Sequence, residues 1–289
     1  MDGSSALVGA LGSKNMVGLY SILGIYFSLI ILYRVRQGGL PALLAVMTMA
    51  LCALGLVKAH SAGSVLSLGG AIAVTFGVMF IARFPQRVRG RLLGAVATVV
   101  VIVGIVAVNL GVQGDVLSAF GKNATLTGRT YLWGQGIKAG LENPILGDGY
   151  AAFWVVGEPK AERYWHEFKI DNKYGFHFHN MYVQTFVDLG GVGVIILAYL
   201  VLSSFIRSIR RAARDGADAE SLLCLGISTF FLVRSFVEVD FIGPFGVPAF
   251  LFFSVLPRLE EYRGTTATPS QPLPRQRDIK PGPYPRPAQ

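Results

Sequence analysis

Charge is scarce in this chain of 289 residues, since 15% of the residues are charged and 52% are hydrophobic. A soluble globule of this size needs more charged side chains on its surface, so the composition favours a membrane protein. The mean hydropathy of +0.51 points the same way. Basic residues exceed acidic ones by 26 to 17. Because most of this excess falls in short loops between apolar runs, it indicates membrane topology rather than nucleic-acid binding.

Cysteine is scarce as well. The two cysteines, Cys52 and Cys224, lie inside apolar runs, which excludes a disulfide framework and a cysteine-based metal site. Cysteine usage therefore says nothing about the redox compartment. The first five residues lack the basic segment that opens a signal peptide, so we expect no cleaved leader and expect the first apolar run to direct insertion.

Apolar runs are abundant, and about 20 such residues cross a bilayer as a helix. Seven runs reach or approach that length, at 16–33, 40–57, 64–82, 92–112, 183–206, 221–237 and 241–256. The sequence predicts an all-α integral membrane protein, a polytopic helical bundle of about seven spans with one large external loop containing short helices. We expect a four-span region at 1–112, a large periplasmic loop at 113–182, a three-span region at 183–257 and a disordered Pro-rich cytoplasmic tail at 258–289.

The long loop between the fourth and fifth runs concentrates aromatic and ionisable side chains. It holds three of the four histidines and all three tryptophans. A loop of this length in a compact bundle is usually functional or disordered, and its aromatic content argues against disorder. Within it, Leu132, Trp133, Ile137 and Leu141 recur at helical spacing after Arg129, which predicts a short amphipathic helix suited to a membrane surface.

Four short motifs mark the loop and the start of the next span: L-T-G-R-T-Y-L-W at 126–133, N-P-I-L-G-D-G-Y at 143–150, H-F-H-N-M-Y-V-Q at 177–184 and D-L-G-G-V-G at 188–193. In this order they resemble the O-antigen ligase and polysaccharide polymerase family, particularly its exopolysaccharide polymerase branch. Two flanking segments extend the resemblance: G-S-K-N-M-V-G at 12–18 and R-S-F-V-E-V-D at 234–240. Many members, especially ligases, carry Ser-Arg where this chain has Ser61-Ala62, so the ligase alternative is the weaker one.

The resemblance implies an inverting glycosyl transfer from an undecaprenyl-diphosphate-linked oligosaccharide to a sugar acceptor, in exopolysaccharide or O-antigen polymerisation. It implies a multi-pass protein of the bacterial inner membrane, with other polysaccharide assembly proteins as candidate partners, no nucleic acid, no cofactor and no metal. His179 is then the catalytic base and Arg129 the cation that binds the diphosphate, because imidazole titrates near neutrality and the guanidinium binds phosphate bidentately. Candidate substrate-binding residues are Lys14, Asn15, Trp133, Asn180, Tyr182, Arg234 and Glu238.

Each assignment has an alternative. Arg129 is a surface cation and His179 a structural histidine if the resemblance is set aside. His177 and His179, with His166 nearby, also fit a metal site, although no carboxylate or cysteine stands at ligand spacing. Arg234 and Glu238 are four residues apart and so able to neutralise each other on one helical face.

Two other classes compete with the transferase, namely O-antigen ligase activity on a lipid core and a membrane transporter of polysaccharide precursors. In a transporter, Arg234, Glu238, Asp240 and Asp188 would line a substrate path. That class predicts charged residues deep in several spans and symmetric broken-helix halves, and neither is evident. A non-catalytic scaffold would leave the histidine-rich loop without a purpose.

The position of Lys14 and Asn15 is unusual for this family. Their motif normally follows several earlier spans, whereas here it begins about a dozen residues from Met1. The chain therefore resembles the family without its first transmembrane helices. We expect an upstream membrane portion, or a partner that supplies one, to be necessary for activity.

Basic residues give a testable topology, because lysine and arginine in short loops stay on the cytoplasmic side. Sixteen of them fall in one set of alternate loops and the tail: Arg34, Arg36, Arg83, Arg87, Arg89, Arg91, Arg207, Arg210, Arg211, Arg214, Arg258, Arg263, Arg275, Arg277, Lys280 and Arg286. We predict an outside N-terminus, a periplasmic 113–180 loop and a cytoplasmic Gln289. Reporter fusions in the loop and at the C-terminus check this, and a cytoplasmic loop would contradict it.

Overall fold

The computed structural model describes residues 7–8, 11–35, 38–109, 128–171, 173, 175–214, 216–241, 243 and 246–261. Within these residues the regular structure is entirely helical, which confirms the predicted class. Residues 258–261, which we expected to begin the disordered tail, belong to a helix that ends at Glu261, and the rest of that tail lies outside the described residues. Loop residues 110–127 lie outside them as well, so the motif at 126–133 is described from Gly128 only.

Seven helices occupy the predicted runs: α1 (Lys14–Arg34), α2 (Leu40–Ala59), α3 (Ala62–Ile81), α4 (Gln86–Asn109), α8 (Met181–Arg214), α9 (Ala219–Arg234) and α10 (Val247–Glu261). Among the described residues, α1, α2, α3 and α8 are long and apolar enough to cross a membrane. Helix α4 has 24 residues and covers the fourth run up to Asn109, while α9 and α10 have 16 and 15. The number of seven spans stays a prediction.

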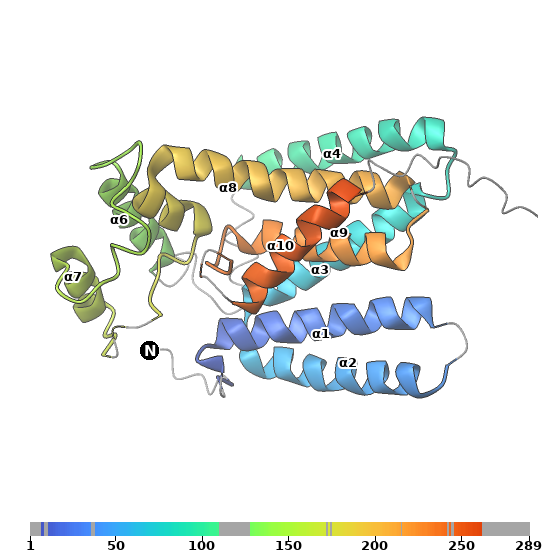
Figure 1. The fold of residues 1–289 in the computed structure, drawn as a ribbon, viewed down its shortest axis with the longest axis horizontal. Coiled ribbons are helices and arrows are strands. Elements are labelled where there is room, and N and C mark those ends of the chain that lie inside the picture. The colour runs from blue at the N-terminus through green and yellow to red at the C-terminus, as the bar shows by residue number, and fades with distance from the viewer. Residues whose placement is uncertain are drawn as a thin grey trace, which may run out of the picture.

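Consecutive bundle helices run in opposite directions along the long axis of the molecule (Figure 1). The C-terminal ends of α1, α3 and α8 therefore gather at one end, together with the described arginines of the predicted cytoplasmic loops: Arg34, Arg83, Arg87, Arg89, Arg91, Arg207, Arg210, Arg211 and Arg214. There, Nη1 of Arg89 donates to the carbonyl oxygen of Ala213 at 2.6 Å. The start of α8 lies at the opposite end, beside the helices of the long loop. The bundle thus has one arginine-rich end and one end formed by the loop.

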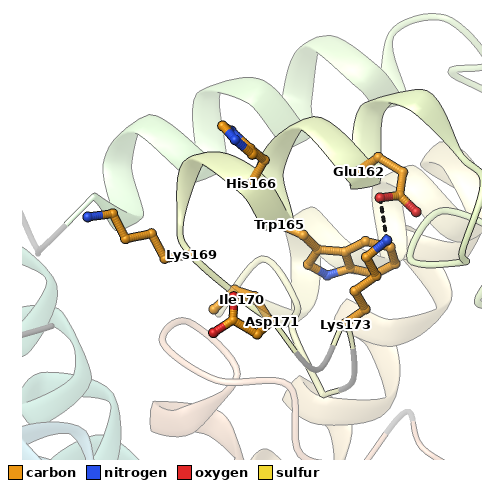
Figure 2. A pocket seen from close by; sticks show the side chains of 7 residues that line it. All are labelled: Glu162, Trp165, His166, Lys169, Ile170, Asp171 and Lys173. Atoms are coloured by element: carbon orange, nitrogen blue, oxygen red, sulfur yellow. Dashed lines mark hydrogen bonds and ion pairs between the residues drawn. The ribbon is translucent and has the colours of Figure 1, made fainter.

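The long loop folds into two short helices, α6 (Arg129–Gly140) and α7 (Pro159–Glu167). Helix α6 confirms the helix predicted there, but its buried residues are Leu132, Gly136, Ala139 and Gly140, whereas Ile137 and Leu141 are exposed. Its amphipathic role at a membrane surface stays a prediction. Loop and bundle share a small core of Leu132, Ala139, Phe153, Tyr164, Phe178, Val183 and Val187. Beside α7 opens a cavity of about 700 Å³ (Figure 2).

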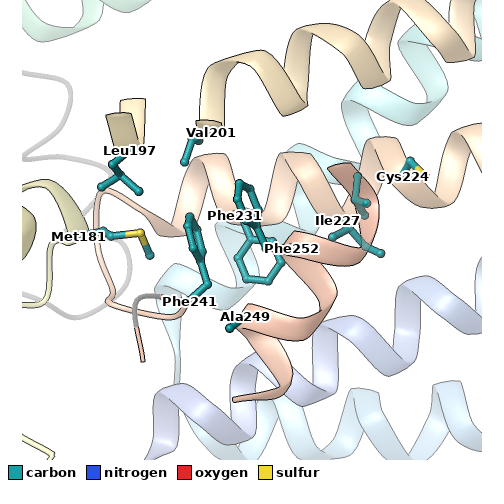
Figure 3. Close-up of a cluster of buried hydrophobic side chains, with 10 residues drawn as sticks. Met181, Leu197, Val201, Cys224, Ile227, Phe231, Phe241, Ala249 and Phe252 are labelled. Atoms are coloured by element: carbon teal, nitrogen blue, oxygen red, sulfur yellow. The ribbon is translucent and has the colours of Figure 1, made fainter. Parts of the chain in front are cut away.

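A second core joins the three C-terminal helices (Figure 3). Phe241, which follows α9, stacks on Phe252 of α10 with ring centroids 4.0 Å apart, and both rings meet Phe231 edge-on. Because Phe241 closes the segment 235–241, this stacking fixes the end of the segment against the bundle.

The long loop docks onto a break in α8. At Gly190 the backbone has φ 63° and ψ −164°, so the helix is interrupted there. The carbonyl oxygens of Val187 and Asp188 accept hydrogen bonds from the amides of Asp148 and Gly149 at 2.9 and 3.0 Å, and the amide of Gly191 donates to Pro144 at 2.8 Å. Two predicted motifs, at 143–150 and 188–193, therefore pair backbone to backbone.

Glycine is required for this pairing. A Cβ atom built on Gly190 would lie 2.3 Å from the backbone of Ile145, and one on Gly147 would lie 2.5 Å from Asp188. The backbone angles of Gly190 lie in a region of the Ramachandran plot that is essentially restricted to glycine. The run Gly190-Gly191 thus serves a loop-to-helix contact.

We predict that Gly190→Ala lowers the free energy of unfolding. Backbone strain alone should cost ~1–3 kcal/mol, and the clash of the new Cβ with Ile145 should add to it. The matched control is Gly69→Ala in α3, where a Cβ meets no atom within 4 Å. Thermal unfolding in detergent, followed by size-exclusion chromatography, should show a lower midpoint for Gly190→Ala alone. Equal midpoints for the two variants would contradict the docking described here.

Candidate active site

A buried carboxylate, that of Glu238, joins the bundle to the loop. Glu238 is 6% exposed and lies in the segment that follows α9, where its amide donates to the carbonyl oxygen of Arg234 at 2.8 Å. Nη2 of Arg129 donates to its Oε1 at 2.9 Å, and Nδ1 of His179 lies 3.4 Å from its Oε2. The two predicted catalytic residues therefore share one anion.

Arg129 is positioned as the first residue of α6. The preceding Gly128 has φ 78°, and a Cβ there would lie 3.1 Å from the ring of Phe168, so glycine permits this entry into the helix. Besides Glu238, the guanidinium donates through Nη1 to the carbonyl oxygen of Val237 at 2.9 Å. Its side chain is 21% exposed. Five N–H donors belong to a guanidinium, and the described residues engage two of its nitrogen atoms, so donors remain for an anionic ligand.

His179 is held by its chain neighbours. It has a left-handed backbone, with φ 50°, and its amide donates to Nδ1 of His177 at 3.0 Å. The next residue, Asn180, accepts hydrogen bonds from the amides of Tyr182 and Val183, which caps α8. The Asn180 amide group also donates to the carbonyl oxygen of Phe236 at 3.1 Å. This places Asn180 in a positioning role, and its predicted contact with sugar stays a prediction.

The charges of the cluster are set by these contacts. Burial on its own would raise the pKa of Glu238, but the hydrogen bond with His179 and the nearby positive charges lower it to about 2. Burial and the neighbouring His179 lower the pKa of His177 to about 3. At neutral pH the site therefore has an ionised Glu238 and a neutral His177 that accepts a hydrogen bond.

Arg234 has a different partner from the one that its spacing predicts. Its side chain is 1% exposed and binds Asp240 bidentately, with Nη2–Oδ1 at 2.7 Å and Nε–Oδ2 at 2.5 Å. The direct ion pairs join Arg234 to Asp240 and Arg129 to Glu238, so Arg234 and Glu238 are not each other's hydrogen-bonded partners among the described residues. The Arg234–Asp240 pair closes the segment that carries Glu238, a link that we did not assign from the sequence although Asp240 ends the quoted motif.

The N-terminal motif reaches the same region. Nη1 of Arg234 donates to Oγ of Ser64 at 2.9 Å, Ser64 lies 3.0 Å from Ser61, and Ser61 donates to Oδ1 of Asn15 at 3.4 Å. A Cβ on Gly18 would lie 2.4 Å from Oγ of Ser64, so this glycine permits the close approach of α1 to α3. Lys14 begins α1 beside Asn15.

Trp133 and Tyr182, the two aromatic candidates for substrate binding, each make a hydrogen bond to another segment of the chain. Nε1 of Trp133 donates to the carbonyl oxygen of Phe178 at 2.8 Å, and the hydroxyl of Tyr182 accepts a hydrogen bond from Ser235 at 3.3 Å. Both rings therefore lie beside the H-F-H-N-M-Y segment, and their predicted contact with sugar stays a prediction.

A metal site is the remaining alternative. Ligand atoms of His177, His179 and Glu238 all lie within 4.8 Å of one another. Two histidines and one carboxylate are a known zinc ligand set. The structure thus supplies the carboxylate that the sequence spacing lacked. Against a metal, Arg129 already binds one oxygen of Glu238, and Nδ1 of His177 already accepts a hydrogen bond.

Comparison with known proteins identifies the family of the chain. Residues 47–198 match the O-antigen ligase family. The chain is also 37% identical, over 253 residues, to the exopolysaccharide production protein ExoQ of Rhizobium meliloti (strain 1021), an alignment that covers 88% of this chain and 58% of the relative. The chain thus spans under two thirds of that relative. With its apolar helices and its motifs joined around Glu238, the chain is a multi-pass membrane protein that belongs to the O-antigen ligase family.

Proposed function

We propose that this chain carries the active site of an inverting glycosyltransferase that polymerises a lipid-linked oligosaccharide into exopolysaccharide. The observation that carries the proposal is the buried Glu238 carboxylate shared by Arg129 and His179. A diphosphate leaving group requires a cation with free donors, and an attacking hydroxyl requires a base such as imidazole; here one carboxylate holds both.

The reaction breaks the bond between the anomeric carbon and the diphosphate oxygen, and the diphosphate leaves with the bonding electrons. Arg129 stabilises the charge that develops on it. An acceptor hydroxyl attacks the anomeric carbon from the opposite face, which inverts the configuration, and its proton passes to Nε2 of His179. This nitrogen is the acceptor because Nδ1 faces Glu238.

Glu238 acts on both residues without touching substrate. A base oriented by a third group is the general arrangement of such sites. Since the carboxylate is buried and ionised, it fixes the His179 ring and stabilises the positive charge that the ring gains. The same carboxylate holds Arg129 beside the base.

The polymerase is favoured over the ligase by Ser61-Ala62 and by the name of the relative, which links that protein to exopolysaccharide production. A transporter is disfavoured because the elements that carry the charged cluster, the starts of α6 and α8 and the segment after α9, meet at one end of the bundle (Figure 1). We place this end at the periplasmic face, with an undecaprenyl-diphosphate-linked glycan as donor.

We predict that Arg129→Lys lowers polymer formation roughly tenfold to hundredfold, because an ammonium cannot form parallel contacts with a diphosphate while binding Glu238 and Val237. The variant is made in the chromosomal gene, so that any upstream portion is retained, and polymer is quantified against protein level on a blot. The control is Arg210→Lys at the other end of the bundle. Wild-type polymer from Arg129→Lys would move the diphosphate site elsewhere, first to Arg234.

We predict that His179→Ala abolishes polymer formation without loss of membrane insertion, since a general base contributes about 10²- to 10⁴-fold. Glu238→Gln should also lose most activity, whereas His177→Ala and His166→Ala should lose less. Membrane fractions are assayed for product with and without a chelator. Inhibition by the chelator that added metal reverses would show that His177, His179 and Glu238 bind a metal instead.

A further inference from the structure

The cavity beside α7 has the size and lining of a ligand site. Its volume of about 700 Å³ lies in the range of roughly 300–1,000 Å³ that small-molecule sites occupy. The side chains in Figure 2 come from α7 and from the residues that follow it, and they combine an indole, an imidazole, two carboxylates and two ammonium groups. None of them belongs to the cluster around Glu238.

The indole of Trp165 lacks a polar partner among the described residues. Its Nε1 is buried and makes no hydrogen bond there, and the residue is 2% exposed. In Figure 2 this nitrogen lies on the edge of the ring that faces Ile170 and Asp171. A buried donor left unpaired costs about 1–3 kcal/mol. An acceptor atom of a ligand in the cavity would satisfy it.

The charges of the lining balance. Lys173 pairs with Glu162 at 2.7 Å and lies 5.8 Å from the centre of the Trp165 ring. Asp171 and Lys169 add one charge of each sign. A diphosphate would need an excess of cations, whereas hydroxyl groups need both acceptors and donors, which carboxylates and ammonium groups supply. The unpaired indole N–H, the carboxylates and the ammonium groups together supply donors and acceptors for the hydroxyl groups of a sugar.

A chain of aromatic contacts links the cavity to the base. Phe168, next to Lys169, packs on Gly128 just before Arg129 and lies 5.5 Å from Phe176. The ring of Phe176 in turn meets that of His179 edge-on at 6.2 Å. A glycan with its reacting hydroxyl at His179 would have its neighbouring sugar residues on this side.

We propose that the cavity beside α7 is a saccharide-binding subsite that holds an uncharged sugar residue of the glycan, away from the reacting hydroxyl. Trp165 and Asp171 hydrogen-bond its hydroxyl groups, and Lys169 and Lys173 donate from the rim. The inference rests on the proposed function, because it takes the glycan as substrate.

Saccharide binding to the whole protein, purified in detergent, tests the proposal. The probe is the repeat-unit oligosaccharide cut from the strain's own polymer, titrated by saturation-transfer NMR, with inorganic pyrophosphate as the second probe. Asp171→Asn should weaken oligosaccharide binding roughly threefold to tenfold. Trp165→Phe, which keeps a ring but removes the N–H, should do the same. The control is Lys160→Ala on α7, the helix that carries Trp165. It breaks a surface ion pair with Glu142, and the variant should bind as the wild type does.

The outcomes separate this inference from the proposed reaction. His179→Ala should bind the oligosaccharide normally while making no polymer. Normal oligosaccharide binding by both Asp171→Asn and Trp165→Phe would overturn the subsite. A loss of pyrophosphate binding in place of oligosaccharide binding would assign the cavity to the carrier and also overturn it. If His179→Ala still makes polymer, the proposed base fails, whereas weaker binding by the two subsite variants would still support the cavity.

Discussion

The carboxylate of Glu238 is the contact on which the site depends. It is buried, ionised and bound on one oxygen by Arg129 and approached on the other by His179. A buried charge is tolerated when partners compensate the loss of water, and here both partners come from the long loop. Folding the loop against the bundle and assembling the cluster are therefore one event.

Two backbone features bring these partners to Glu238. The loop docks on the break of α8 at Gly190, and this fixes α6 and its first residue, Arg129, against the same helix that His179 precedes. On the bundle side, Arg234 is bound by Asp240 and Ser64, which closes the segment that presents Glu238. Helices therefore position both the loop residues, Arg129 and His179, and the bundle residue, Glu238. A catalytic site needs such rigid support to keep its geometry.

The division of the molecule follows from the same contacts. Apolar helices form the bundle, while the loop forms a polar and aromatic layer at the end away from the arginine-rich loops (Figure 1). The donor that we propose, a lipid-linked glycan, has an apolar carrier and a polar saccharide, and we propose that each part binds one of these regions. The cavity lined by Trp165 extends the polar layer beyond the cluster.

The sequence by itself determined the membrane class, the apolar helices, the short helix at α6 and the family, because hydropathy, helical spacing and short motifs are local properties. It also named Arg129, His179 and Glu238. Their assembly was decided by tertiary structure, since Glu238 lies 59 residues from His179 and 109 from Arg129 along the chain. Spacing alone paired Glu238 with Arg234, four residues away, but the turn after α9 directs Arg234 to Asp240. Local patterns cannot predict such a choice, because burial and the approach of a distant loop decide which charges meet.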